Sequence, residues 1–238
     1  MVMILLAGLV IAMGAFVQGT AGIGLALVAA PLLAIVEPRL IPVPLLVVAI
    51  GHALLTLRRE WGDADWSGVG WALLGRLPGV ALGVLMVAAL SPRGFRAVVA
   101  IIVLVCVALS MVRWQPRPTR PALLAAGLVS GAGGTAAAIG GPPVALLYQR
   151  ASGARVRATM AAYFAVGSVL SMAGLAIGGQ VDADGLYTGS LLLPFMIVGY
   201  LLSTPARRVL DRGWVRPAVL GLALAGAIGL LVQAALSG

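Results

Sequence analysis

Residues 19–24 of this chain read Gly-Thr-Ala-Gly-Ile-Gly, and residues 131–141 read Gly-Ala-Gly-Gly-Thr-Ala-Ala-Ala-Ile-Gly-Gly. Each stretch lies inside a long apolar run, the first at 3–36 and the second at 122–148. Glycine at this density interrupts a helix and lets the backbone approach another group closely. A straight membrane crossing needs about 20 apolar residues, so each run is also too long for one crossing. We therefore predict that both runs are glycine-broken or re-entrant.

The two glycine-rich stretches belong to an internal repeat. The sequence Ala-Gly-Leu-Val at 7–10 recurs at 126–129, and Asp-Ala-Asp at 63–65 recurs at 182–184, both at an offset of 119. An offset of 116 aligns further pairs: Ile23-Gly24 with Ile139-Gly140, Arg39 with Arg155, Gly51 with Gly167 and Pro78 with Pro194. A repeat of half the chain is typical of secondary transporters, whose binding site lies between the two halves.

The composition and the spacing of apolar segments predict an all-α polytopic membrane protein. Hydrophobic residues make up 61% of the chain and charged residues 10%, and the mean hydropathy is +1.10, which leaves too few polar side chains to cover a soluble domain. Each half holds four apolar segments, at 3–36, 40–57, 69–90 and 98–112, and at 122–148, 158–177, 186–202 and 215–236. We assign 1–118 to the first transmembrane repeat and 119–238 to the second, which together form one transporter domain.

The basic residues indicate membrane orientation rather than a nucleic-acid surface. All 16 are arginine, the net charge is +9, and almost all lie at the ends of apolar runs. Nucleic-acid binding needs a water-exposed domain that carries the basic patch, and no long polar stretch is present. We therefore expect the lipid bilayer as a partner and no nucleic acid.

The distribution of the arginines also helps to decide between two membrane topologies. If each long run crosses once, the halves are parallel with eight spans, and the loop arginines divide ten against five. If each long run enters and returns as a hairpin, the halves are inverted, and the loop arginines, Arg113 included, divide twelve against three. The second division is the stronger positive-inside bias and favours inverted repeats. The acidic loops recur in both halves, which parallel repeats would explain. Both topologies place the two termini outside.

The interrupted helices are the first candidates for a binding site. Backbone groups at a break inside the membrane must face protein or a solvated cavity, and a helix that restarts there offers free N–H donors to an oxyanion. The candidates are Gln18, Gly19, Thr20, Gly22 and Gly24 at the first break, and Ser130, Gly133, Gly134, Thr135, Gly140 and Gly141 at the second. The alternative is close helix packing through small residues.

Two ionisable residues lie inside apolar segments. Arg76 lies within 66–90, and the repeat places Leu192 opposite it, so its charge is not a product of symmetry. It either binds an anion at depth or extends its side chain to the membrane surface. His52, the only histidine, aligns with Ser168. It either relays a proton or donates to an anion, or it is a hydrogen-bonded packing residue.

The other polar residues suggest no catalysis. Arg39 and Arg155 fit membrane anchoring, with attraction of anions at a cavity mouth as the alternative. Asp63, Asp65, Asp182 and Asp184 fit short loops outside the membrane and form no catalytic pair. One histidine and one cysteine far apart do not suit a membrane-embedded enzyme, and neither a metal cluster nor a phosphate loop is present. We expect a protein that is not an enzyme and needs no cofactor.

Several motifs resemble a known family. They are the glycine-broken segment 8–33, Gly-Leu-Val-Ser-Gly-Ala-Gly-Gly at 127–134, Gly-Gly-Pro-Pro at 140–143 and Arg-Val-Arg-Ala-Thr-Met-Ala-Ala-Tyr-Phe at 155–164. Together they resemble the TauE/SafE sulfite exporter family over essentially the whole chain. The resemblance implies a permease or exporter of the bacterial inner membrane, driven by an ion gradient. It implies sulfite, sulfoacetate or another organosulfonate as substrate.

The residues and the resemblance together predict a secondary transporter for a small anion that works by alternating access, with the two glycine breaks meeting near the midplane. Coupling to H+ or Na+ and assembly as a homodimer are compatible with this prediction. The alternatives are a transporter of another small anion, such as a carboxylate, and a membrane subunit without transport activity.

Overall fold

The computed structural model describes residues 2–22, 24–111, 116–209 and 212–236, which excludes the predicted loop position Arg113. These residues form ten α-helices and two short 3-10 turns, and no strand occurs among them. The helices are α1 (Val2–Ala21), α2 (Leu25–Val36), α3 (Val43–Glu60), α4 (Trp66–Ala89), α5 (Pro92–Met111), α6 (Arg120–Ala137), α7 (Gly141–Leu147), α8 (Gly153–Ile177), α9 (Ala183–Val209) and α10 (Arg212–Leu236).

Within the part of the chain that the structure describes, six helical stretches are long and apolar enough to cross a membrane, and two further apolar helices are shorter. The long ones lie in α1, α3, α4, α5, α8 and α9, and the shorter ones are Leu25–Val36 and Leu220–Leu236. The prediction of an all-α, multi-pass membrane protein is therefore confirmed.

Both long apolar runs are broken at their glycine-rich stretches. In the first run, α1 ends at Ala21 and α2 begins at Leu25, while Gly22 and Gly24 adopt φ angles of 82° and 135°. These backbone conformations are open to glycine and unfavourable for other residues. In the second run, α6 ends in the left-handed residue Ala138, at φ 58°, and α7 follows after Gly140.

After each break the chain turns back against the helix it has left. A Cβ atom at Gly14 would lie 2.9 Å from the carbonyl oxygen of Leu25, and one at Gly133 would lie 2.7 Å from that of Ile139. The side-chain oxygen of Gln18 also accepts a 3.0 Å hydrogen bond from the backbone N–H of Leu25. Small residues on α1 and α6 therefore make room for the returning chain.

The long helices fall into two groups that run in opposite directions. Neighbours in the first group, α1, α3 and α9, touch in increasing order: Gly8 with Phe195, Ala12 with Gly199, Val47 with Gly189 and Gly51 with Leu193. Neighbours in the second group, α4, α6 and α8, do the same: Gly75 with Leu124, Gly83 with Thr135, Arg76 with Gly167 and Val84 with Gly178. Between the groups, the end of α3 meets the start of α8, where Glu60 pairs with Arg157.

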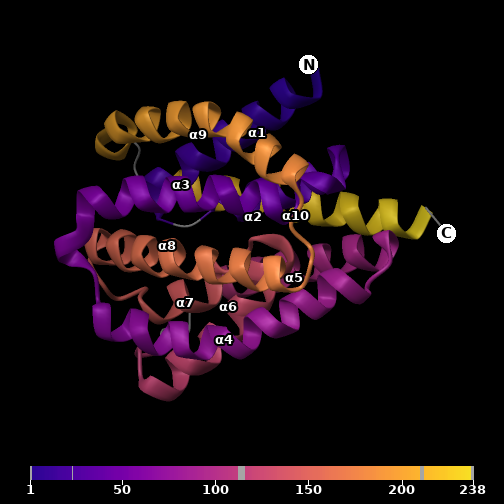
Figure 1. Cartoon of the computed structure of the whole chain (residues 1–238). Helices are drawn as coiled ribbons and strands as arrows, with labels where there is room; N and C mark the ends of the chain where they lie inside the picture. The colour runs from indigo at the N-terminus through magenta and orange to yellow at the C-terminus, as the bar shows by residue number, and fades with distance from the viewer. Residues whose placement is uncertain (1, 23, 112–115, 210–211, 237–238) are drawn as a thin grey trace.

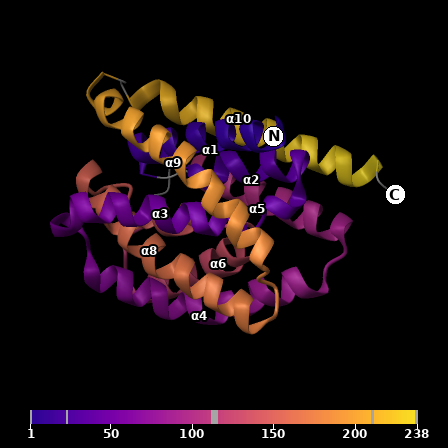
Figure 2. The same cartoon turned by 45° about the horizontal axis from the view of Figure 1, so that its top comes forward.

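The long helices lie in layers, one above another. In Figure 1, α9 lies over α3, α3 over α8 and α8 over α4, while both termini lie toward the right-hand side of the view. Figure 2 shows α10 beside α1 and α2 on the far side of α9. A cluster of buried apolar residues from α1, α2, α5, α9 and α10 forms the main core, and a second cluster joins α3, α4, α7 and α8.

The most extensive helix contact joins α4 to α6, and glycines permit it. On α4, Gly75, Gly79 and Gly83 follow one another at four-residue spacing and face the backbone of α6. Gly127 and Gly131 on α6 face the backbone of α4 in return, and a Cβ at Gly79 would lie 2.9 Å from the Cα of Gly131. Close approach through small residues is how membrane helices pack without a hydrophobic driving force.

Candidate functional site

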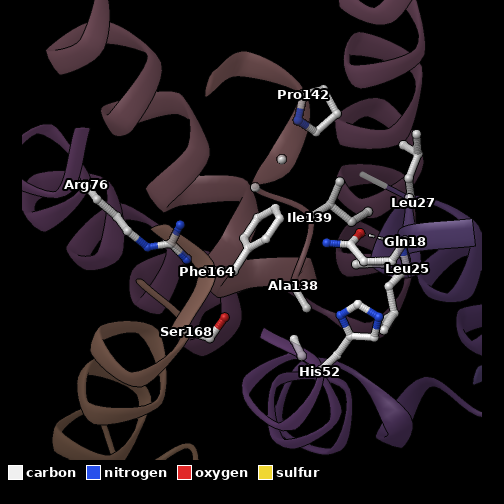
Figure 3. A pocket seen from close by; sticks show the side chains of 15 residues that line it. Gln18, Leu25, Leu27, His52, Arg76, Ala138, Ile139, Pro142, Phe164 and Ser168 are labelled. Carbon is white, nitrogen blue, oxygen red and sulfur yellow. Dashed lines mark hydrogen bonds between the residues drawn. The ribbon is translucent and has the colours of Figure 1, made fainter. Parts of the chain in front are cut away.

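A cavity lies where the two broken helices meet α3, α4 and α8. Its lining includes Gly24 from the first break and Gly140 from the second, together with His52, Arg76 and Ser168 (Figure 3). The cavity has a volume of about 40 Å³, counted as the space that the centre of a water molecule can occupy. One water needs roughly 10–15 Å³ on this measure, so the space suits about three waters or a small anion.

Arg76 is the charged group of this cavity and is only 1% exposed. Its Nη1 donates hydrogen bonds to Ser130 Oγ at 3.3 Å and Tyr163 Oη at 3.1 Å, and its Nη2 donates to Ser171 Oγ at 2.9 Å. The guanidinium also lies 5.2 Å from the centre of the Tyr163 ring. This burial does not fit the alternative in which the side chain reaches the membrane surface.

The partners of Arg76 are all neutral. Among the residues that the structure describes, Arg76 forms no ion pair, and its Nε has no hydrogen-bond partner. A buried cation normally has a counter-charge because removing it from water is costly. The guanidinium therefore has capacity for an anion.

Four glycines make the space that the Arg76 side chain occupies. A Cβ atom would lie 2.6 Å from its Nη2 if placed at Gly134, 2.8 Å from its Nε at Gly167 and 3.2 Å from its Nη1 at Gly140. A Cβ at Gly131 would lie 3.1 Å from the Arg76 Cγ atom. The glycines of the second break thus serve the arginine as well as helix packing.

His52 lies on α3, on the other side of the cavity from Arg76, with Phe164 and Ser168 between them (Figure 3). It is 3% exposed. Its Nε2 lies 3.2 Å from the carbonyl oxygen of Ala15, and its ring meets the ring of Tyr200 edge to face, with 5.4 Å between centres. These contacts fix the ring at the cavity wall.

The remaining predicted residues of the first break divide into two sets. Gln18 lines the cavity with Gly24 and bonds to the start of α2. The Thr20 hydroxyl donates back to the carbonyl oxygens of Phe16 and Val17 in its own helix. Gly19 and Gly22 are buried outside the cavity lining, and a Cβ at Gly22 would lie 3.0 Å from Arg157 Cγ.

The predicted residues of the second break divide into two that line the cavity and four that lie behind it. Gly141 lines it with Gly140. Ser130 donates to the Gly140 carbonyl oxygen and accepts from Tyr163 Oη at 2.7 Å, while Thr135 Oγ1 lies 2.8 Å from Ser171 Oγ. Gly133 receives the returning chain at Ile139. These hydroxyl groups hold Arg76 rather than line the cavity.

Sequence reasoning missed four side chains of α8 that belong to this arrangement, among them Ser168, which the repeat aligns with His52 but which was not assigned to the site. Tyr163 and Ser171 hold the guanidinium, and Phe164 lines the cavity. The spacing of Tyr163, Gly167 and Ser171, four residues each, puts two polar groups and a gap on one face of an apolar helix. This spacing is the sequence pattern from which Tyr163 and Ser171 could have been predicted as site residues.

Ion pairs lie at the end of the bundle where α3 stops and α8 starts. Arg157 Nε lies 3.0 Å from both carboxylate oxygens of Glu60, and Arg155 Nη2 lies 3.7 Å from Asp65 Oδ2. Asp65 also accepts from Tyr148 Oη at 3.0 Å and caps α4 through Gly68. These charges tie helix ends together, whereas Arg39 is exposed.

The comparisons with known proteins agree with the motifs. No curated protein and no solved structure matched the chain in the corresponding comparisons. The family model described as "Sulfite exporter TauE/SafE" matches residues 5–230, which is nearly the whole chain. The chain therefore belongs to the TauE/SafE sulfite exporter family, a family of membrane transporters.

Proposed function

We propose that the chain is a secondary transporter of the bacterial inner membrane that moves a small sulfur-containing anion, such as sulfite or an organosulfonate, by alternating access. The observation that carries the proposal is Arg76, a buried cation with neutral partners on the wall of a small cavity. Family membership supports the class of solute.

The electrostatics of the cavity favour an oxyanion. An arginine side chain keeps its charge in proteins and offers several N–H donors in a planar fork. The first turn of α2, at Leu25, Ala26 and Leu27, also lines the cavity, and a helix start presents positive partial charge. The Leu25 N–H already donates to Gln18, so we propose that the anion accepts from Arg76 and lies in the positive field of this helix start.

The helix directions support inverted repeats. The repeat register pairs α1 with α6, α3 with α8 and α4 with α9. In every pair one helix belongs to the α1, α3, α9 group and the other to the α4, α6, α8 group, so the members of a pair run oppositely. Two inverted units that meet at a central site give the symmetry on which alternating access depends.

The proposed orientation follows from charge. In this topology the ends of α3 and α9 and the starts of α6 and α8 share one face, and eleven arginines of the described residues lie there or in the adjoining segments. We place that face in the cytoplasm by the positive-inside rule, which puts both termini outside. The proposal includes coupling to a H+ or Na+ gradient and leaves room for a homodimer.

The test measures binding and then flux. The purified protein in detergent is heated with sulfite, thiosulfate, sulfoacetate, taurine, sulfate and short carboxylates, and binding to the folded state raises its melting temperature. A selective rise with a sulfur oxyanion, followed by uptake of that anion into liposomes, supports the proposal. A rise with a carboxylate alone points to the alternative solute. No rise and no flux with any anion contradicts a transport role and favours a membrane subunit.

A further inference from the structure

Phe164 is the largest apolar side chain among the described residues that line the cavity. In Figure 3 its ring lies between the guanidinium of Arg76 and the part of the cavity that Gln18 and His52 line. The ring is half-buried and packs against the second apolar cluster, with 6.0 Å between its centre and that of the Tyr163 ring. An anion that contacts Arg76 therefore meets an apolar ring beside it.

Protein encloses the guanidinium of Arg76 on its other sides. Its Nη atoms donate to the hydroxyl groups of Ser130, Tyr163 and Ser171. A Cβ atom at Gly134 would lie 2.6 Å from Nη2, so the backbone of α6 is close on that side. The part of a bound anion that does not touch the guanidinium therefore extends into the cavity, along the phenyl ring.

We infer that Phe164 limits the length of the anion that the cavity accepts, and that the substrate is a compact sulfur oxyanion without a long carbon chain. The inference rests on the proposed function and narrows its substrate class. The cavity volume of about 40 Å³ suits about three waters. Sulfite, a single sulfur with its oxygens, is of that size, whereas propanesulfonate adds a chain that has to displace the phenyl ring.

The charge of the lining supports the same substrate class. Taurine carries an ammonium group besides its sulfonate, and the described residues of the lining include no aspartate or glutamate that could pair with it. Arg76 would repel the ammonium group as well. Because burying a charge without a partner is costly, the cavity suits an anion that has no charged tail.

The other apolar walls of the cavity are packed more firmly than Phe164. Leu25 and Leu27 in the first turn of α2 are each 3% exposed, and Ile139 is 2% exposed. Pro142 in α7 is buried as well, and its side chain is a ring closed onto the backbone. Close-packed interiors leave such side chains little room to move. The half-buried Phe164 is therefore the wall residue whose size can be changed with the least disturbance.

The experiment uses methanesulfonate, ethanesulfonate, propanesulfonate and butanesulfonate. All members of this series carry the same sulfonate head and a single negative charge, so only the length of the chain changes. Dissociation constants are measured by titration calorimetry on the purified full-length protein in detergent. Sulfite, sulfate and thiosulfate serve as inorganic references, and taurine and sulfoacetate as anions with a second charged group.

For the unmodified protein, we expect affinity to fall about tenfold or more from methanesulfonate to propanesulfonate, because the longer chain overpacks the cavity at Phe164. In Phe164→Ala the order should reverse. Each added methylene then fills space that the ring has left and should raise affinity about fourfold. Phe164→Leu, which removes less volume, should give an intermediate profile.

Phe195→Ala is the matched control. Phe195 is also a half-buried phenylalanine, but it lies on α9 outside the cavity lining, where its ring meets Gly8 of α1. The substitution removes the same atoms as Phe164→Ala and costs packing of the same kind. We expect Phe195→Ala to keep the order of affinities of the unmodified protein.

Three results would overturn the inference while leaving the proposed function intact. In the first, the unmodified protein binds propanesulfonate, taurine or sulfoacetate at least as tightly as methanesulfonate. In the second, folded Phe164→Ala or Phe164→Leu protein keeps the unmodified order of affinities, and in the third, Phe195→Ala reverses that order. The first measurement needs no variant, so a poorly folded Phe164→Ala protein does not prevent the test. If neither the sulfonates nor the inorganic anions bind, the proposed function itself falls.

Discussion

The hydroxyl groups around Arg76 bond to one another as well as to the guanidinium. Tyr163 donates to Ser130, and Thr135 and Ser171 share a hydrogen bond. If the arginine were absent, each of these four hydroxyl groups would still have a hydrogen-bond partner. The cation is therefore supported by its surroundings without being needed by them, which is typical of a residue kept for function at some expense of stability.

Replacement of Arg76 should separate stability from binding. In Arg76→Met we expect the melting temperature without ligand to hold or rise, because exchanging an unpaired buried charge for an apolar chain removes its desolvation penalty. Anion binding should weaken by about ten- to a hundredfold, since a hydrogen bond to a charged group contributes about 1.5–3 kcal/mol. Thermal unfolding with and without the anion measures both effects.

Arg93→Met is the matched control for this substitution. Arg93 is exposed near the start of α5, and its loss should leave the anion-induced rise in melting temperature unchanged. Arg76→Lys keeps the charge but loses the planar fork, and we expect an intermediate affinity. An Arg76→Met protein that binds as tightly as the unmodified one would remove Arg76 from the site.

Gly134→Ala should displace the arginine without unfolding the protein. The added methyl group would lie 2.6 Å from Nη2, at the far end of a flexible side chain that is able to shift. We expect the anion dissociation constant to rise about fivefold or more, because charge-assisted hydrogen bonds depend on geometry. Gly70→Ala, with no neighbouring atom within 4 Å, serves as the control in the same calorimetric titration. Equal affinities in the two variants would contradict this role for Gly134.

The sequence alone predicted many of the residues that lie at the cavity, but it did not predict the directions in which their side chains point. Gln18, Gly24, His52, Arg76, Gly140 and Gly141 were predicted as site residues, and each lines the cavity. Thr20 was predicted as well, but its hydroxyl bonds within α1. Tyr163 and Ser171 were missed because isolated hydroxyls on an apolar helix are common. Their role as hydrogen-bond acceptors for Arg76 becomes visible only when the position of Arg76 in the fold is known.

At the scale of helices, the interface between α4 and α6 does not tolerate larger side chains at its glycines. The glycines of α4 meet backbone atoms of α6, and backbone cannot move aside as a side chain tip can. Packing in the membrane relies on such contacts because lipid offers no hydrophobic driving force between helices.

Gly79→Leu should therefore prevent folding. Its Cβ alone would overlap the backbone of α6 at Leu128 and Gly131, which forces the two helices apart. We expect loss of the monodisperse peak in size-exclusion chromatography. Gly221→Leu on α10 has open space around its Cβ and should behave like the unmodified protein. A well-folded Gly79→Leu protein would show that α4 and α6 do not pack as closely as described.

Helix breaks were predictable from sequence, whereas helix partners were not. Clustered glycines located both interruptions, since Gly22 and Gly24 adopt backbone angles that other residues avoid. The glycines at 75, 79 and 83 have the spacing of a packing face, but the spacing does not say which helix they meet. Partner choice depends on the complementary glycines of α6, more than 40 residues away.

At the scale of the whole molecule, inverted repeats make a prediction about sidedness. Single cysteines at Gly62, Ser91 and Ala183, introduced after Cys106→Ser, test it with a membrane-impermeant thiol reagent on intact cells. Inverted repeats expose Ser91→Cys and Ala183→Cys outside and keep Gly62→Cys inside. Parallel repeats would place positions 91 and 183 on opposite sides, so labelling of only one of the two would contradict the proposed topology.

The contact between α4 and α6 also bears on how the protein is made. The most extensive contacts of α4 are with α6, which the ribosome has not yet synthesised when α4 enters the bilayer. In the same way, α1 packs mainly against α9, which is made much later. The nascent first half must therefore rest in lipid with its glycine face uncovered until the second half arrives. We expect 1–118 and 119–238 to be degraded when expressed alone and to accumulate when co-expressed, as pulse-chase immunoblots would record. That result would show that residues 1–118 and 119–238 depend on each other for survival in the cell.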